Sequence, residues 1–229
     1  MRSASSDQSS DGAITWLRHG RIDLALHRVG GDTGRPLLML HGLAERTPED
    51  LPPWAVSWPG PVWGLDFTGH GRSSLSRGGG YTAEMLLGDA DAALEYLGEA
   101  TLIGRGLGGY IALLLAGARA SRVHGSIVCD GPGIAGGGIQ PGSPFVVIPR
   151  FGLGATPDPF ALVELARDVR PPDYVLNYVR FAFESSPVAD PVVVSATVRP
   201  EWLAAVAAEP GVVEVSRSDA LTMFAAESP

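Results

Sequence analysis

The chain has 229 residues, of which 45% are hydrophobic and 18% charged, so a single α/β domain with a large core accounts for its length. All seventeen basic side chains are arginine, and with twenty-five acidic ones the net charge is −8, which argues against nucleic acid or an anionic membrane as the main partner. The absence of lysine excludes Schiff-base and P-loop chemistry, and a single cysteine, Cys129, excludes an internal disulfide and a cysteine-based zinc cluster.

The N-terminal residues 1–13 are polar and carry no apolar signal core, so we expect a disordered leader. No apolar run approaches 18 residues, which predicts that no segment spans a membrane. A cytoplasmic location is expected from these two observations. Much alanine, glycine and arginine without lysine is typical of a bacterial source.

Strands and one helix are predicted in the first half of the chain. Continuous apolar runs of four residues are typical of strands that are buried on both faces of a parallel sheet. Apolar residues at three-to-four spacing after a capping threonine predict a helix. The predicted elements are a two-stranded hairpin within residues 14–29, strands at residues 37–40 and 62–65, and a helix at residues 81–97 capped by Thr82.

The second half continues the alternation of strands and helices, with one insertion. We predict strands at 101–103, 126–129, 192–195 and 212–215, and helices at 107–118 and 201–208. Alternating strands and helices indicate a mostly parallel sheet. Residues 131–190, with aromatic helices at 160–169 and 173–184, are expected to form a short helical cap between core segments 14–130 and 191–229.

Three glycine-containing motifs follow strands in a fixed order. They are residues 40–43 (Leu-His-Gly-Leu), 66–73 (Asp-Phe-Thr-Gly-His-Gly-Arg-Ser) and 104–109 (Gly-Arg-Gly-Leu-Gly-Gly). Over residues 14–229 this set resembles the α/β-hydrolase superfamily, in the branch of small esterases, lipases and epoxide hydrolases. The resemblance implies helices on both faces of the sheet, an oxyanion loop at the first motif and a nucleophile elbow at the third.

The sequence departs from that family at the catalytic residues. The nucleophile position falls on Gly106, and the histidine position falls on Asp219. The candidate acid is Glu201 or Asp130. Conventional Ser-His-Asp catalysis is therefore predicted to be absent, because losing the nucleophile or the base costs about 10⁶-fold in rate.

The backbone around the missing nucleophile still offers hydrogen-bond donors. The resemblance implies that the amides of Leu43 and Leu107 form an oxyanion hole, and Arg105 is placed to pair with a ligand carboxylate. We expect a non-catalytic or non-hydrolytic binder of a small apolar ligand, without cofactor or metal, that also forms a homodimer or binds a protein partner. The expected ligand-binding residues are His41, Gly42, Leu43, Arg105, Gly106, Leu107 and Asp130.

Two alternative functions stay open. An active hydrolase of unconventional composition would use a water activated by His41, Asp66 or Asp130. Residues 104–109 also spell Gly-x-Gly-x-x-Gly between a strand and a helix, with Asp130 further along, which is the dinucleotide-binding pattern. That pattern normally opens the first βαβ unit, whereas several strands precede it here.

The end of the chain carries one more expectation. Residues 227–229 resemble the start of the final helix of the family. We therefore expect the last helix to be shortened or lost, with sheet surface left for a partner to cover.

Overall fold

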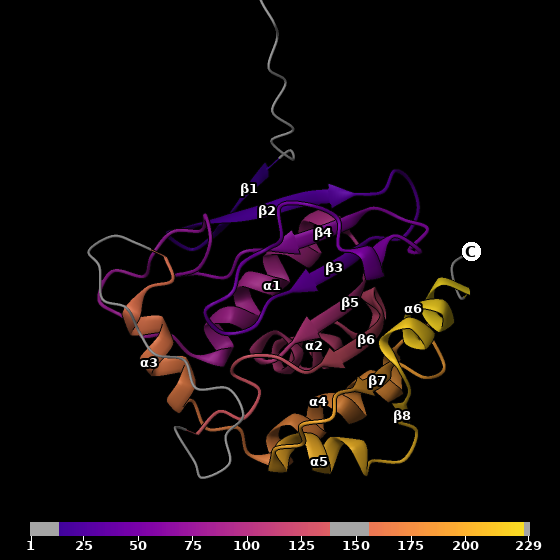
Figure 1. The fold of residues 1–229 in the computed structure, drawn as a ribbon. Helices are drawn as coiled ribbons and strands as arrows, with labels where there is room; N and C mark the ends of the chain where they lie inside the picture. Colours follow the sequence, from indigo (N-terminus) through magenta and orange to yellow (C-terminus); the bar gives the residue numbers. More distant parts are fainter. Residues whose placement is uncertain (1–13, 138–155, 227–229) are drawn as a thin grey trace, which may run out of the picture.

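The computed structural model describes residues 14–137 and 156–226, built around one sheet of eight strands (Figure 1). The sheet order is β1-β2-β4-β3-β5-β6-β7-β8, and β2 runs antiparallel to both β1 and β4 while every other pair is parallel. The mostly parallel sheet is thus confirmed. The strands are β1 (Ile14–His19), β2 (Ile22–Gly30), β3 (Leu37–Leu40), β4 (Val62–Leu65), β5 (Ala100–Arg105), β6 (Val123–Cys129), β7 (Val192–Ser195) and β8 (Val213–Glu214).

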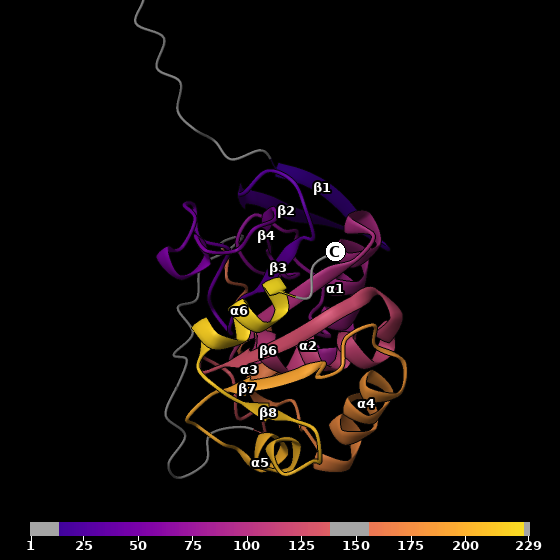
Figure 2. The same cartoon turned by 90° about the vertical axis from the view of Figure 1, so that its right-hand side faces the viewer.

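Helices cover both faces of the sheet, but unequally. In Figures 1 and 2, α1, α2 and α4 lie on one face and α6 lies on the other. The helices are α1 (Ala83–Leu97), α2 (Leu107–Ala118), α3 (Pro159–Arg167), α4 (Pro172–Ser185), α5 (Glu201–Ala207) and α6 (Arg217–Ala226), with 3-10 turns η1 (Pro53–Ala55) and η2 (Ala120–Arg122). Within the described ranges, none of these helices combines the length and apolar character needed to cross a membrane.

The central strand β3 shows why its four residues are all apolar. Successive side chains of a strand point to opposite faces. Leu38 and Leu40 belong to the core under α2, whereas Leu37 and Met39 belong to the core under α6. Because both faces are covered, the predicted continuous apolar run is confirmed as a doubly buried strand.

Helix α1 begins where the sequence pattern predicts a cap. The Oγ1 atom of Thr82 accepts a hydrogen bond from the Met85 amide at 3.2 Å, and Gly98 ends the helix with φ of +85°. The helix starts two residues later than expected, because Thr82 itself is extended. Thr82 is confirmed as the N-cap.

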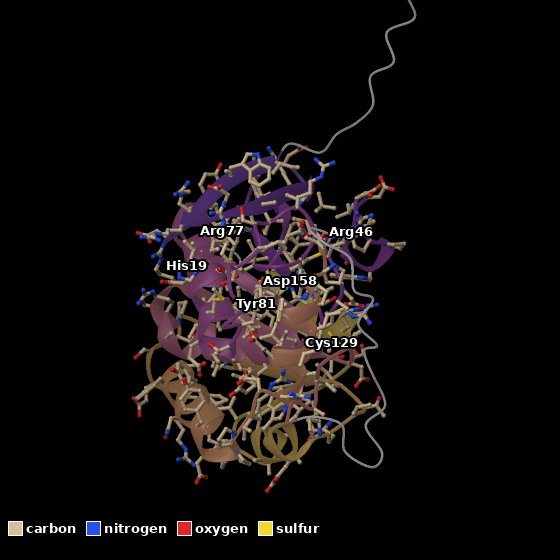
Figure 3. The ribbon with its side chains drawn as sticks, turned by 90° about the vertical axis from the view of Figure 1, so that its left-hand side faces the viewer. His19, Arg46, Arg77, Tyr81, Cys129 and Asp158 are labelled. Carbon is tan, nitrogen blue, oxygen red and sulfur yellow. The ribbon has the colours of Figure 1, made fainter. Side chains whose placement is uncertain are left out.

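The second helix of the expected cap, α4, lies elsewhere in the fold. It packs against α2 and α5 on the sheet face, and a Cβ on Gly117 of α2 would overlap the carbonyl oxygen of Tyr178. Because its backbone lies this close to α2, α4 belongs to the helical layer that covers this face of the sheet and not to a cap over the strand ends. The first helix of the expected cap, α3, is attached to the core where the Tyr81 hydroxyl donates to Asp158 at 2.6 Å (Figure 3). Residues 138–155 of that insertion lie outside the described residues.

Helix α6 follows the last strand and contains Asp219, the position that the resemblance assigns to the histidine of the family. It runs from Arg217 to Ala226 and packs on β6 and β7, a helix that the sequence did not predict. Ser216 caps this helix: the Asp219 amide donates to Ser216 Oγ at 3.2 Å, and that hydroxyl donates to Asp219 Oδ2 at 2.6 Å. Helix α6 therefore covers part of the sheet, whereas residues 227–229, where the start of the family's final helix was expected, lie outside the described residues.

The connection between β3 and β4 leaves room on the α6 face. A crossover between parallel strands usually contains an α-helix. Between Leu40 and Val62 the chain forms only the three-residue turn η1, and Trp58 fills part of the space against the sheet. The strand ends beside this connection are consequently less covered than those on the α2 face.

The packing of α6 can be tested at Phe224, which is fully buried and lies directly over Gly125. Phe224→Ala is expected to lower the free energy of unfolding by about 3–5 kcal/mol, because it leaves a cavity between helix and sheet. Urea denaturation followed by circular dichroism measures this loss. Thr222→Ala, on the exposed side of the same helix, is the control and should change stability little. Equal effects of the two variants would show that α6 does not pack as described.

Candidate functional site

A sharp turn joins strand β5 to helix α2 at the position expected for the nucleophile. Gly106 adopts φ of +58° and ψ of −122°, a conformation that a residue with a side chain rarely takes. On either side of it, added Cβ atoms on Gly104 and Gly108 would overlap neighbouring backbone. The glycines of the third motif thus allow the helix to start close against the strands.

The expected oxyanion hole is occupied by the chain itself. The carbonyl oxygen of Pro132 accepts hydrogen bonds from the amides of Leu43 and Leu107, both at 3.0 Å. These are the two donors that sequence analysis assigned to a ligand. A Cβ on Gly106 would overlap the same carbonyl oxygen and the backbone of Gly131. The space for a nucleophile and for an oxyanion is therefore filled by residues 131–134, hereafter the Pro132 loop.

Side chains from two other elements hold the Pro132 loop in place. Arg170 Nη1 donates to the carbonyls of Gly133 at 2.5 Å and Ile134 at 2.8 Å. Trp202 Nε1, from α5, donates to the Ile134 carbonyl at 2.8 Å. The loop is thus bonded on one side by the amides of Leu43 and Leu107 and on the other by buried side chains.

Arg170 is a buried cation, and this makes its contacts costly to break. Burial lowers the pKa of its guanidinium to about 10, so the group still carries its charge at neutral pH. The guanidinium carbon lies 4.8 Å from the ring centre of Tyr110. Removing the carbonyl acceptors would leave this charge buried without hydrogen-bond partners, which is strongly unfavourable.

Two buried histidines hold the loop after β3 to the loop after β4. His41 Nε2 accepts a hydrogen bond from the Phe67 amide at 3.1 Å, and its Nδ1 lies 2.8 Å from the Gly42 carbonyl. His70 Nε2 accepts from the Ala44 amide at 3.3 Å, and its Nδ1 lies 3.2 Å from the Thr68 carbonyl. In each ring the amide fixes Nε2 as the acceptor and the carbonyl fixes Nδ1 as the donor, so both rings are neutral.

Burial lowers the pKa of both rings, and that of His70 falls to about 3. Asp66 is equally engaged. Its carboxylate accepts from the amides of Thr47 and Arg72, both at 2.8 Å, and lies 2.9 Å from His27 Nε2. Burial opposes ionisation, but these hydrogen bonds outweigh it and lower the pKa of Asp66 to about 2. None of these three groups presents an uncommitted atom toward Gly106.

The candidate acids lie apart from one another. Asp130 accepts hydrogen bonds from the amides of Thr197 and Val198, both at 2.8 Å, and so fixes the loop after β7. Glu201 is exposed at the start of α5. Asp219 is exposed at the start of α6, where its carboxylate accepts from the Ser216 hydroxyl. The structure does not bring these three carboxylates together.

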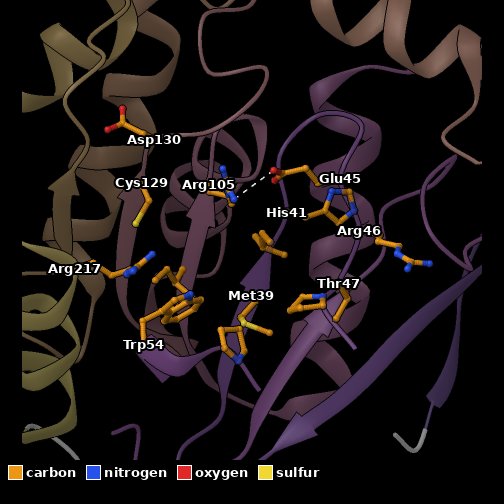
Figure 4. Close-up of a pocket in the computed structure, with 14 residues that line it drawn as sticks. Met39, His41, Glu45, Arg46, Thr47, Trp54, Arg105, Cys129, Asp130 and Arg217 are labelled. Carbon is orange, nitrogen blue, oxygen red and sulfur yellow. Dashed lines mark ion pairs between the residues drawn. The ribbon is translucent and has the colours of Figure 1, made fainter. Parts of the chain in front are cut away.

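A pocket of about 510 Å³ lies beside these positions, on the α6 side of the strand ends (Figure 4). Of the seven expected ligand-binding residues, His41, Arg105 and Asp130 line it, whereas the other four surround the Pro132 loop. Its floor comes from the ends of β3, β5 and β6, and its walls come from residues 45–54 and α6. The lining residues are Met39, Leu40, His41, Glu45, Arg46, Thr47, Pro48, Pro52, Trp54, Ile103, Arg105, Cys129, Asp130 and Arg217.

A second, more open pocket of about 570 Å³ adjoins the first and shares Trp54, Cys129, Asp130 and Arg217 with it. Between the two, the Arg217 guanidinium lies over the Trp54 ring at 4.8 Å from its centre. Cys129 is a buried thiol whose pKa burial raises to about 11, so it is not a reactive thiolate at neutral pH.

The residues that shape the Pro132 loop and the pocket on the α6 side were not predicted from the sequence. Pro132 was not expected at the oxyanion hole, although Gly-Pro-Gly directly after a strand signals a tight turn there. Trp54 and Arg217 were not expected in the pocket. They meet because the connection between β3 and β4 is a loop with the short turn η1 instead of a helix. The Pro-Pro-Trp segment at 52–54 was the available sign that this connection is not helical.

No protein-family model matches the chain, and no curated protein matches it. Among solved structures, the chain is similar to an epoxide hydrolase from Vigna radiata, with 19% identity over 53% of this chain and 39% of that chain and a TM-score of 0.44. It is also similar to mouse alpha/beta hydrolase domain-containing protein 10, with 20% identity over 52% and 48% and a TM-score of 0.42.

A Pseudomonas aeruginosa protein described as hypothetical is 28% identical over 52% of this chain and 43% of that chain, with a TM-score of 0.44. The match spans less than half the length of each of these three structures. The fold is more directly evident in the sheet itself. An eight-stranded sheet in the order 1-2-4-3-5-6-7-8 with β2 antiparallel, together with the glycine turn at Gly106 between β5 and α2, gives this chain the α/β-hydrolase fold.

Proposed function

We propose that this chain is a non-hydrolytic protein of the α/β-hydrolase fold that binds a small apolar ligand in the pocket on the α6 side. The observation that carries this proposal is the Pro132 carbonyl, which takes both oxyanion donors and the space of a nucleophile side chain. A hydrolase of this fold needs those donors to stabilise the negative charge that develops in the transition state. Here they already have an acceptor.

The alternative of a hydrolase with other residues finds little support in the geometry. A general base needs an atom that can take a proton from water. His41 and His70 use both ring nitrogens in backbone hydrogen bonds, and Asp66 and Asp130 accept two or more hydrogen bonds each. These side chains hold backbone loops in place through hydrogen bonds.

Dinucleotide binding at residues 104–109 meets a similar obstacle. A pyrophosphate would need the amides at the start of α2. The Leu107 amide donates to Pro132, and the Gly106 amide donates to the Cys129 carbonyl at 2.9 Å. These two amides are therefore not available to a pyrophosphate, and the Pro132 loop lies against them. The glycines of residues 104–109 are explained by the close approach of this loop and of the neighbouring strands.

The pocket on the α6 side supports ligand binding. Its volume of about 510 Å³ falls within the range of small-molecule sites, which is about 300–1,000 Å³. Met39, Ile103 and Trp54 give it apolar surface, and the arginines and Glu45 give it polar groups at defined positions. This combination is typical of a site that orients a small organic molecule.

The proposal predicts no ester hydrolysis by the native chain. Purified protein should turn over p-nitrophenyl butyrate no faster than a heat-denatured sample, and a fluorophosphonate probe should label no serine. Both results follow from the absence of a nucleophile at Gly106 and from the occupied oxyanion donors. Turnover well above the denatured sample would overturn the proposal.

Restoring a serine should not restore activity. Gly106→Ser is expected to lower the free energy of unfolding by about 2–4 kcal/mol, because the new Cβ overlaps the Pro132 carbonyl oxygen and the backbone has positive φ. Gly20→Ser is the matched control, since Gly20 has nearly the same φ, +59°, with open space around its added Cβ. Thermal unfolding should show a much larger loss for Gly106→Ser, and esterase assays of both variants should stay at background. A gain of esterase activity in Gly106→Ser would contradict the described position of the Pro132 loop.

The neutral histidines predict a pH dependence of stability. The unfolded pKa of histidine is 6.5, and the folded pKa of His70 is about 3, so the stability that its neutral ring contributes is present above pH 6.5 and is lost as the pH falls toward 3. We expect the free energy of unfolding to fall between pH 6.5 and 4.5 by up to about 1.4 kcal/mol per pH unit per buried histidine, and Tm to decline with it. Asp66, whose folded pKa is about 2, adds its own loss only as the pH falls below the ordinary aspartate pKa of 3.8.

His70→Gln should weaken this decline, because an amide side chain does not titrate. The measurement is Tm by calorimetry at fixed ionic strength for both proteins. A native Tm that stays level from pH 6.5 to 4.5 would show that the rings accept protons without breaking the loops apart.

A further inference from the structure

The three arginines around the pocket differ in their partners. Arg46 forms an ion pair with Glu49 at 2.8 Å, and Arg105 forms one with Glu45 at 3.3 Å. Within residues 14–137 and 156–226, no carboxylate lies within 4 Å of the Arg217 guanidinium. One cation of the pocket therefore has no anionic partner in the described part of the chain.

The surroundings of Arg217 hold its charge at the wall of the pocket. Its guanidinium lies over the face of Trp54, and Figure 4 shows it reaching from α6 toward that ring. A cation placed over an indole face keeps its edge N–H groups available to an acceptor in the plane of the guanidinium. Arg217 is thus positioned to donate to a ligand that enters the pocket.

The floor next to this cation is apolar. Met39 and Ile103, at the ends of β3 and β5, are at most 7% exposed and belong to the core under α6. Beside them lies the ring of Trp54. A ligand that satisfied Arg217 would lay its remaining atoms against this surface and away from water, which is favourable for hydrocarbon.

We propose that the pocket takes a small monocarboxylate with an apolar body, whose carboxylate pairs with Arg217 and whose body lies on Met39, Ile103 and Trp54. This assignment names the ligand class for the proposed function and rests on it. A planar guanidinium matches a carboxylate with two parallel hydrogen bonds. Arg105, at the end of β5, is half exposed and paired with Glu45, so Arg217 is the pocket arginine left to meet the carboxylate.

The charges nearby favour a single negative charge on the ligand. Glu45 and Asp130 also line the pocket, and the whole chain carries a net charge of −8. A ligand with several negative charges would meet repulsion from both carboxylates, with only one arginine lacking an ion-pair partner to compensate. A monocarboxylate balances Arg217 and leaves the two existing acidic groups with their present partners.

Octanoate and octanamide are suitable probes, since they share one hydrocarbon chain and differ in the charge of the head group. Isothermal titration calorimetry at low ionic strength should show binding of octanoate to the native chain and at least tenfold weaker binding of octanamide. Arg217→Gln should weaken octanoate binding about tenfold or more and leave octanamide binding within about twofold. Arg21→Gln, at an exposed arginine in the β1–β2 turn, is the matched control and should bind both probes as the native chain does.

The other outcomes are equally informative. Equal affinity for the two probes, or octanoate binding that survives Arg217→Gln, would overturn the carboxylate assignment and leave an apolar-ligand pocket. Failure of both probes to bind would overturn the assignment as well. The proposed function would be contradicted by a different result, namely ester hydrolysis by the native chain.

Discussion

The carbonyl group of Pro132 determines how the backbone packs around the ends of the strands. The oxygen of Pro132 accepts from Leu43 and Leu107, so two backbone donors that would otherwise face a cavity are satisfied inside the protein. The approach of this carbonyl requires a glycine at position 106, since any Cβ there would overlap it. It also draws residues 133 and 134 inward, and their carbonyls then need Arg170 and Trp202 as donors.

Polar groups that could do chemistry in another protein hold loops together in this one. His41, His70 and Asp66 connect the backbone after β3 to the backbone after β4, and Asp130 fixes the loop after β7. A pocket lies on the α6 side of the strand ends, where the β3–β4 connection contains a three-residue turn instead of a helix. The position of the pocket is therefore a consequence of how one crossover is built.

The fold was largely predictable, because doubly buried strands leave an unmistakable apolar pattern and the glycine motifs mark strand ends. The glycine at the elbow was predictable too, but not the group that fills its space, because Pro132 comes from a loop 26 residues further along. Helix α6 was not predicted although Ser216 can cap it, since the resemblance assigned Asp219 to the position of the family's histidine. The pocket was missed because Trp54 and Arg217 are brought together only by tertiary packing.

The stack of Arg217 on Trp54 has a further consequence for the size of what can bind. It stands between two cavities of about 510 and 570 Å³ that already share four residues. A cation–π contact of this kind contributes about 0.5–2 kcal/mol, which is small beside the hydrocarbon surface that a long ligand would bury. Because both spaces are lined by the Trp54 ring and the Arg217 guanidinium, the boundary between them is made of side chains that these two pockets share. Ligand length at this edge of the sheet therefore depends on side-chain packing as well as on the backbone.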